Sequence, residues 1–294
     1  MTHPQAHGSF DQIPTDRTLI MGILNVTPDS FSDGGQHAET RSALAHAHQL
    51  LDQGADIIDV GGESTRPGAT RVPLAEEQRR VLPVIEALAA EGVVMSVDTL
   101  NPATARAAVA AGAQIINDVS GMNLSQDMIE TVAELGVPYI LMHARGSSQT
   151  MDSQAVYSNT AAEVTSELLG LRDRLLAGGV APQQIILDPG PGFAKQGQQN
   201  WQILAAIKGL ADQGHRVLVA GSRKRFMGQL LREQEARFTG QPLETIAERP
   251  PQDRDVAAAA LSLMAAEAGA WAVRVHNVQA TADALAVRQA WLTA

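Results

Sequence analysis

The chain has 294 residues, a formal net charge of −10 and no cysteine. The acidic balance, without any lysine-rich run, argues against nucleic acid or an anionic membrane as the main partner. The lack of cysteine excludes disulfide bonds, thiolate metal sites and cysteine nucleophiles. Hydrophobic residues make up 45% of the chain and aromatic residues only 3%, so aliphatic side chains must fill a sizeable core.

The N-terminal segment and the most apolar run bear on location and domain boundaries. Residues 1–17 contain Pro, His, Gly and Asp but no apolar segment, which predicts a flexible tail and not a signal peptide. Residues 256–273 approach the length of a membrane span, but they are alanine-rich and contain Ser262 and Glu267, which favours a core helix followed by a strand. The sequence therefore predicts a cytoplasmic protein with one domain over residues 18–294 and no membrane partner.

From residue 18 onward the chain repeats one pattern, in which a short β-branched or aliphatic run leads into a polar loop and then into a helical segment. Residues 56–68 show it most clearly, because a buried strand runs straight into Gly61, Gly62 and a polar loop. We expect strands at 19–24, 56–60, 93–97, 114–116, 138–142, 184–187, 217–220 and 272–275. We expect helices at 40–53, 74–90, 101–111, 126–135, 161–177 and 201–211, one or two more within 225–268, and a last one at 278–291.

Eight strand-then-helix units predict a single (β/α)8 TIM barrel, whose active site lies at the carboxyl-terminal ends of the strands. No Gly-x-Gly-x-x-Gly motif opens a helix after a strand, which makes a Rossmann fold less favoured.

Turn-forming residues are common after strands, so one polar residue there means little. Seven of the expected strands, however, end in polar residues that a core would not choose.

The polar residue types at the strand ends suggest a ligand. Asp98, Asn117 and Asp188 would form an anionic pocket from three strands, and a carboxylate pairs well with two parallel N–H donors such as the edge of a pterin or guanine ring. Positive charge and further donors for a phosphate or diphosphate come from another group of residues, namely Arg66, Lys224, Arg274 and His276. His143, at the end of the fifth strand, is interpreted as a cap of that strand.

Ordered motifs along the chain identify a family. They are Gly22-Ile-Leu-Asn-Val-Thr-Pro-Asp-Ser-Phe-Ser-Asp-Gly-Gly35, Asp59-Val-Gly-Gly-Glu-Ser-Thr-Arg-Pro-Gly68, Ser96-Val-Asp-Thr99, Ile116-Asn-Asp118, Leu187-Asp-Pro-Gly190 with Gly192-Phe193, Ser222-Arg-Lys224 and Arg274-Val-His276. With these motifs the chain resembles the dihydropteroate synthases of folate biosynthesis over about residues 18–293. The Lys-Arg-Phe after Arg223 and the Gly-Ala-Trp before the eighth strand resemble actinobacterial members.

This resemblance implies a transferase reaction, in which p-aminobenzoate attacks the exocyclic methylene of 6-hydroxymethyl-7,8-dihydropterin diphosphate. The products would be 7,8-dihydropteroate and pyrophosphate, formed by an SN1-like displacement assisted by Mg²⁺. The family also implies a homodimer. By the same resemblance, the catalytic residues are Lys224, Arg274 and His276.

The family's binding residues carry over to matching positions of this chain. Pterin-binding residues are Asp98, Asn117, Asp188 and Lys224, with Gly221 beside the ring. Diphosphate-binding residues are Asn25, Thr65, Arg66, Arg274 and His276, and Asn25 is also the Mg²⁺ ligand. The p-aminobenzoate pocket corresponds to Thr65, Pro67, Phe193, Ser222 and Lys224, with Phe31 and Asp33 on a mobile lid formed by the first loop.

Two other functions remain open from the sequence. A pterin-dependent methyltransferase on a similar barrel would share Asp98, Asn117 and Asp188, but it has no use for residues that bind diphosphate. A non-catalytic pterin-binding paralogue should have lost loop residues that this chain keeps, such as Asn25 and Lys224. Release of pyrophosphate in the presence of p-aminobenzoate distinguishes the synthase from both.

Overall fold

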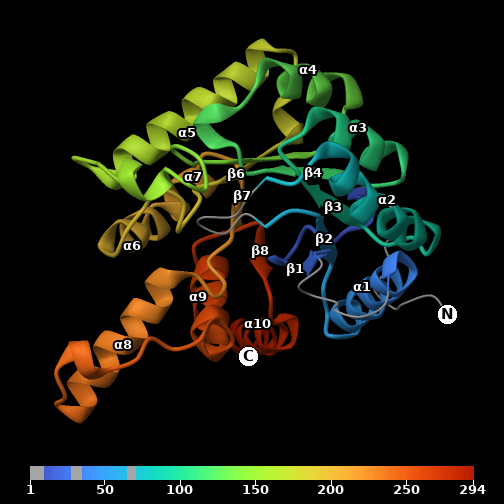
Figure 1. Cartoon of the computed structure of the whole chain (residues 1–294). Helices are drawn as coiled ribbons and strands as arrows, with labels where there is room; N and C mark the ends of the chain where they lie inside the picture. Colours follow the sequence, from blue (N-terminus) through green and yellow to red (C-terminus); the bar gives the residue numbers. More distant parts are fainter. Residues whose placement is uncertain (1–9, 28–34, 65–70) are drawn as a thin grey trace.

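The computed structural model describes residues 10–27, 35–64 and 71–294 (Figure 1). Eight parallel strands close into a barrel, in which each strand pairs with its neighbours in the sequence and β8 returns to pair with β1. The strands are β1 (Leu19–Asn25), β2 (Ile57–Gly61), β3 (Met95–Asp98), β4 (Ile115–Asp118), β5 (Tyr139–Met142), β6 (Ile185–Asp188), β7 (Arg216–Val219) and β8 (Ala272–Val275). The predicted (β/α)8 barrel is confirmed.

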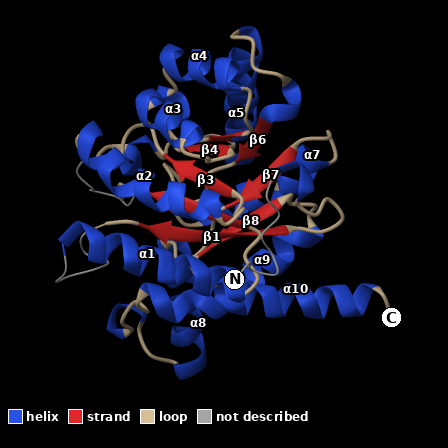
Figure 2. Ribbon diagram, turned by 90° about the vertical axis from the view of Figure 1, so that its right-hand side faces the viewer, coloured by secondary structure: helices blue, strands red, loops and turns tan. Residues whose placement is uncertain are grey.

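Helices surround the strands (Figure 2). They are α1 (Gly35–Asp52), α2 (Leu74–Ala90), α3 (Pro102–Ala110), α4 (Gln126–Leu135), α5 (Thr160–Ala177), α6 (Gln198–Ala205), α7 (Ile207–Ala211), α8 (Arg225–Thr239), α9 (Asp255–Glu267) and α10 (Val278–Leu292). Side chains of Asn101, Ser125, Asn159 and Asn277 accept backbone N–H groups at the starts of α3, α4, α5 and α10, as good N-cap residues do.

The helix bounds differ from the sequence prediction by more than one residue at two places. The expected helix at 201–211 is two helices, because the chain closes tightly at Ala206, whose N–H reaches the carbonyl of Ile203. The first helix begins at Gly35 instead of residue 40, in a stretch with no apolar period to reveal it. The expected one or two helices between 225 and 268 are α8 and α9, with short 3-10 turns at the intervening prolines.

Alternation along the strands divides the barrel into two apolar layers and a polar one. Every second residue faces outward and joins the layer between strands and helices, as Ile58 and Val60 do on β2. The residues between them face inward, and Ile57 joins the apolar layer inside the barrel. That inner layer contains Leu19, Met21, Ile57, Val94, Ile115, Ile140, Ile186, Leu218 and Ala272. Asp59 is the next inward residue on β2, so the polar residues of the strand ends stand directly above this apolar floor.

Residues 10–17 do not form the flexible tail that the sequence predicts over 1–17. Ile13 is buried and joins the inner apolar layer, and the Phe10 ring lies 6.1 Å from that of Trp271. Arg17 donates to both oxygens of the buried Asp56, at 2.9 and 2.6 Å. This segment closes the end of the barrel opposite the carboxyl-terminal ends of the strands. It thereby shields the inner apolar layer from water. Residues 1–9 lie outside the described residues.

Within the part of the chain that the structure describes, no helix is long and apolar enough to cross a lipid bilayer. The run at 256–273 is α9 followed by β8, as the sequence predicts. The expected cytoplasmic location stays a prediction.

The contribution of the N-terminal segment can be measured. Ile13→Ala should lower the free energy of unfolding by about 2–5 kcal/mol, because it removes a buried side chain from a packed layer. Gln12→Ala, at an exposed neighbouring position, is the matched control and should change it by less than about 0.5 kcal/mol. Urea denaturation followed by circular dichroism measures both. Equal, small effects would mean that residues 10–17 are a dispensable tail after all.

Candidate active site

A cavity of about 1190 Å³ lies at the carboxyl-terminal ends of the strands. Predicted site residues from five strands or their following loops line it together. They are Asn25, Asn117, Asp188, Phe193, Ser222, Lys224, Arg274 and His276. Phe31, Asp33, Thr65, Arg66 and Pro67 lie outside the described residues.

Two other predicted residues lie at the cavity without lining it. Asp98 is buried at the end of β3 and is bound to Arg274, which does line the cavity. Gly221 comes directly after the cavity residue Ala220, and a Cβ placed on it would lie 2.3 Å from the side chain of Leu261. A side chain at this position would therefore force the Leu261 side chain on α9 to move.

The electrostatic centre of the site is a buried guanidinium between two carboxylates. Arg274 donates from Nε to Asp59 and from NH2 to Asp98, the second contact at 2.9 Å. Burial opposes the charge on Arg274, yet the two carboxylates raise the pKa of the guanidinium above its ordinary value. The resemblance assigns Arg274 to the diphosphate, and that role stays a prediction. In this structure Arg274 binds Asp98 of the expected pterin pocket and Asp59.

Asp59 is the residue that the sequence reasoning did not assign. It is fully buried and accepts from the Ser96 hydroxyl, from Nδ2 of Asn117 at 3.2 and 3.3 Å, and from Arg274. The alternation of side chains along β2 could have identified it, because Asp59 is two residues after Ile57 and therefore faces the barrel interior as Ile57 does. By holding the amide nitrogen of Asn117, Asp59 leaves the amide oxygen on the side away from itself.

Burial shifts the titration of three groups that the sequence places in the site. It raises the pKa of Asp98 to about 7, although the charge of Arg274 lowers it, and also raises the pKa of Asp188. It lowers the pKa of Lys224 to about 7, although Asp188 opposes this shift. Perturbed groups of both signs in one cavity are typical of a functional site. A ligand that brings its own donors and acceptors would replace the water these groups have lost.

The loop after β6 brings an aromatic ring to the cavity. Gly190 donates its N–H to Asp188 at 2.7 Å, which starts the turn directly at the end of the strand. Nζ of Lys224 donates to the carbonyl of Pro191 and lies 4.4 Å from the centre of the Phe193 ring. This cation–π contact sets Phe193 and Lys224 against each other on one side of the cavity.

The loop after β7 and the end of β8 form a side suited to an anion. The Ser222 hydroxyl lies 3.2 Å from the backbone nitrogen of His276 and 3.1 Å from its Nδ1. Helix α8 begins at Arg225, and Arg225 and Phe226 of its first turn line the cavity, so a helix N-terminus, which favours anions, lies at this side. Arg223, with a φ of 60°, is held by an ion pair with Asp255 through two contacts of 2.7 Å.

Asn25, at the end of β1, lines the cavity and carries one neutral side-chain oxygen. Among the described residues there is no group of three or more His, Asp or Glu side chains that could hold a metal ion. Mg²⁺ takes few protein ligands and completes its octahedron with phosphate oxygens and water. The cavity residues therefore fit a Mg²⁺ that arrives with a diphosphate.

Comparisons with known proteins agree on one family. A family model described as pterin binding enzyme matches residues 21–276. The dihydropteroate synthase of the actinobacterium Mycobacterium leprae (strain TN) is 45% identical over 276 residues, which cover 94% of this chain and 94% of that protein. A structure of the Xanthomonas albilineans enzyme with 4-aminobenzoic acid is 43% identical, with a TM-score of 0.83 and 96% of each chain covered. Another, in complex with 7,8-dihydropteroate, is 40% identical, with a TM-score of 0.81 over 96% of each chain.

The role of Asp59 as the partner of Arg274 predicts a large effect from a small change. Asp59→Asn should lower the free energy of unfolding by about 3–5 kcal/mol, because it removes a charge from a buried ion pair and turns an amide donor toward other donors. Ser96→Ala removes only one neutral donor to the same carboxylate, at a cost of about 0.5–1.5 kcal/mol. Chemical denaturation of both variants measures the difference. A cost for Asp59→Asn no greater than that for Ser96→Ala would contradict this role.

Proposed function

The chain belongs to the dihydropteroate synthases, the transferases that make 7,8-dihydropteroate in folate biosynthesis, and we propose how its own residues perform this reaction. One observation supports the proposal most strongly. A single cavity has one side with Asn117 and Asp188, behind which Asp98 binds Arg274, and a cationic, donor-rich side at Lys224 and the start of α8. Such a cavity suits a heterocycle with an N–H edge that carries an anionic leaving group.

The pterin ring is proposed to bind between Asp98, Asn117 and Asp188. Its amino group and neighbouring ring N–H present two parallel donors, which a carboxylate accepts well. Lys224 donates to the acceptors on the opposite edge of the ring, with Gly221 beside it. Because burial has raised the pKa of Asp188 and lowered that of Lys224, the incoming ring restores hydrogen-bond partners to both.

The diphosphate is proposed to lie on the side of the cavity suited to an anion, near Asn25, His276 and Arg274. Thr65 and Arg66, in the loop that follows β2 in the sequence, are proposed to bind it as well. Breaking the carbon–oxygen bond leaves negative charge on pyrophosphate and positive charge on the pterin methylene. His276 and the first turn of α8 stabilise the leaving anion, and Arg274 adds its charge. A Mg²⁺ bound with the diphosphate and ligated by Asn25 would neutralise further charge on the leaving group.

p-Aminobenzoate is proposed to bind beside Phe193 and Ser222, with Thr65 and Pro67 of the second loop. Its aniline nitrogen is already nucleophilic near neutral pH, so no strong general base is needed. Holding it in line with the methylene contributes up to about 7–11 kcal/mol in ideal cases. Phe31 and Asp33 of the first loop are proposed to close over it as a lid and exclude water, which would otherwise capture the pterin cation.

The two alternatives from the sequence find less support. A methyltransferase would have no use for the anion side formed by Ser222, Lys224 and His276. A non-catalytic paralogue would not need the tight arrangement of Lys224 and Phe193. The relatives above, similar over 94–96% of this chain, are dihydropteroate synthases by name.

The decisive assay is release of pyrophosphate from the pterin diphosphate, with and without p-aminobenzoate. Asp188→Asn should weaken pterin binding ten- to a hundredfold, about 1.5–3 kcal/mol for one charge-assisted pair, because the amide presents a donor to a donor. Calorimetry should show p-aminobenzoate binding changed much less. Unchanged pterin binding would move the recognition carboxylate elsewhere, with Asp98 next in line.

The proposed Mg²⁺ makes a separate prediction. In excess chelator, turnover should fall at least about tenfold, because Asn25 is neutral and leaves the charge of the leaving group uncompensated. Adding Mg²⁺ back should restore turnover. Full activity in the chelator would exclude the metal from the reaction.

We also propose that the protein is a homodimer. Exposed apolar side chains lie on α9 and α10, among them Val256, Met264, Val287 and Trp291, with 67–83% of each residue exposed. A second copy would remove these side chains from water. Sedimentation at several concentrations measures the mass, and a monomer throughout would contradict the proposal.

A further inference from the structure

A buried lysine that the proposed reaction does not use anchors the turn after β6. Lys195 is 4% exposed, and its Nζ lies 3.0 Å from the carbonyl oxygen of Gly190 and 2.8 Å from that of Phe193. The same Nζ lies 2.9 Å from Nδ1 of His143 and 3.3 Å from the carbonyl oxygen of His143. Lys195 therefore joins both ends of the turn to the end of the neighbouring strand β5.

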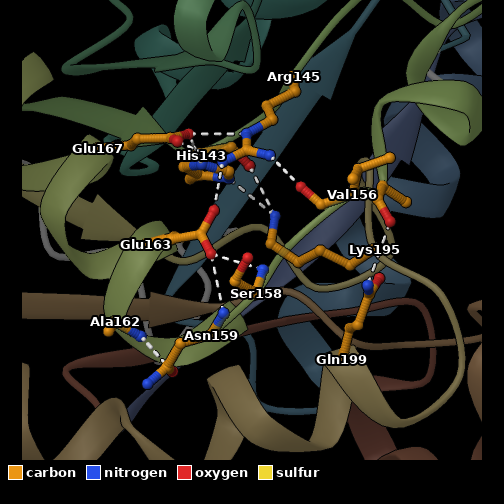
Figure 3. A network of polar contacts seen from close by, with 11 residues as sticks. His143, Arg145, Val156, Ser158, Asn159, Ala162, Glu163, Glu167, Lys195 and Gln199 are labelled. Carbon is orange, nitrogen blue, oxygen red and sulfur yellow. Dashed lines mark hydrogen bonds and ion pairs between the residues drawn. The ribbon is translucent and has the colours of Figure 1, made fainter.

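A chain of contacts extends from this lysine to the surface (Figure 3). Because Lys195 donates to Nδ1 of His143, the proton of the imidazole lies on Nε2, which donates to Glu167 at 2.9 Å. Arg145 binds the same carboxylate, with its Nε at 3.0 Å. Burial, reinforced by Lys195, lowers the pKa of His143 to about 4, so the ring is neutral at neutral pH. Glu167, on α5, thus selects the tautomer that accepts from Lys195.

The anchored turn has a backbone that would not hold its shape unaided. Ala194 has a φ of 50°, in the left-handed region that side chains other than glycine rarely adopt. Such a conformation persists where the surroundings over-determine it. Gly190 packs so closely on β5 that an added Cβ would lie 2.0 Å from the His143 carbonyl oxygen. Asn200 holds the turn from the other side by accepting the N–H of Gly192 at 2.6 Å.

The turn carries the side of the cavity assigned to the amine substrate. Phe193 lies against Lys224, which also donates to the carbonyl of Pro191. Asp188, in contrast, belongs to β6, and its carbonyl accepts the N–H of His143 at 2.9 Å within the barrel wall. A loosened turn would therefore move Phe193 much more than Asp188.

We propose that Lys195 is a positioning residue, held in place by His143 and Glu167, that fixes Phe193 for the binding of p-aminobenzoate. The proposal rests on the proposed function, since it names a residue that prepares the same site. Lys195 contacts no substrate in this role. It acts through the backbone of the turn.

Lys195→Met tests the role directly, because it keeps the length of the side chain and removes its donors. The KM for p-aminobenzoate should rise about tenfold, while the Kd of the pterin diphosphate should change less than about threefold. Lys208→Met, at an exposed lysine on α7, is the matched control and should change neither constant. Equal losses in both constants would overturn the proposal, because they would mean that Lys195 only stabilises the fold.

A second set of variants avoids the buried position in case Lys195→Met does not fold. Glu167→Leu, at a partly exposed position, removes the acceptor for His143 and should raise the KM for p-aminobenzoate about threefold or more. Glu167→Gln keeps an acceptor oxygen and should restore the KM to within about twofold. Glu163→Leu, which loses contacts to Arg145 and to the backbone of Ser158 and Asn159 but none to His143, is the control and should leave the KM unchanged.

The outcomes separate this proposal from the proposed function. If the wild-type enzyme releases no pyrophosphate with p-aminobenzoate, the proposed function fails before any variant is compared. If the wild type is active and Glu167→Leu behaves like Glu163→Leu, the function stands and the positioning role is overturned.

Discussion

In a closed barrel of parallel strands, every second side chain must face the lumen, and this constraint places the whole site. Ile57 and Asp59 are two residues apart on β2, so one lies in the apolar floor and the other directly above it. The same step separates Ile115 from Asn117 on β4 and Ile186 from Asp188 on β6. Polar groups from separate strands therefore meet at one level, where the floor below excludes water.

Exclusion of water explains both the electrostatics and the cost of the site. Burial raises the pKa values of Asp98 and Asp188 and lowers that of Lys224, so it favours the neutral form of all three groups. Arg274 compensates part of this cost through Asp59 and Asp98. The remaining cost lowers the free energy of unfolding, and a ligand that supplies hydrogen-bond partners to these groups recovers it as binding free energy.

Two loops at the strand ends hold shapes that their own residues disfavour. Ala194 after β6 and Arg223 after β7 both have positive φ values, 50° and 60°. Each is stabilised by side-chain contacts. Lys195 donates to the carbonyl of Gly190 in the turn that contains Ala194, and Arg223 forms an ion pair with Asp255. Rigid loops of this kind present Phe193, Ser222 and the start of α8 in defined places, as catalysis by positioning requires.

The sequence by itself determined the barrel, because its strands and helices follow local periods of hydrophobicity and local capping residues that act within a few positions. It also determined which strand ends are polar, and family motifs assigned roles to Asp98, Asn117, Asp188 and Lys224. Only the tertiary structure decided which distant groups meet. Arg274 pairs with Asp59 across 215 residues, and Lys195 reaches His143 across 52. Ile13 fills the barrel end although Asp11 and Gln12 precede it and Thr15 and Asp16 follow it closely. Such contacts depend on closure of the barrel and on packing between elements, and no local pattern encodes them.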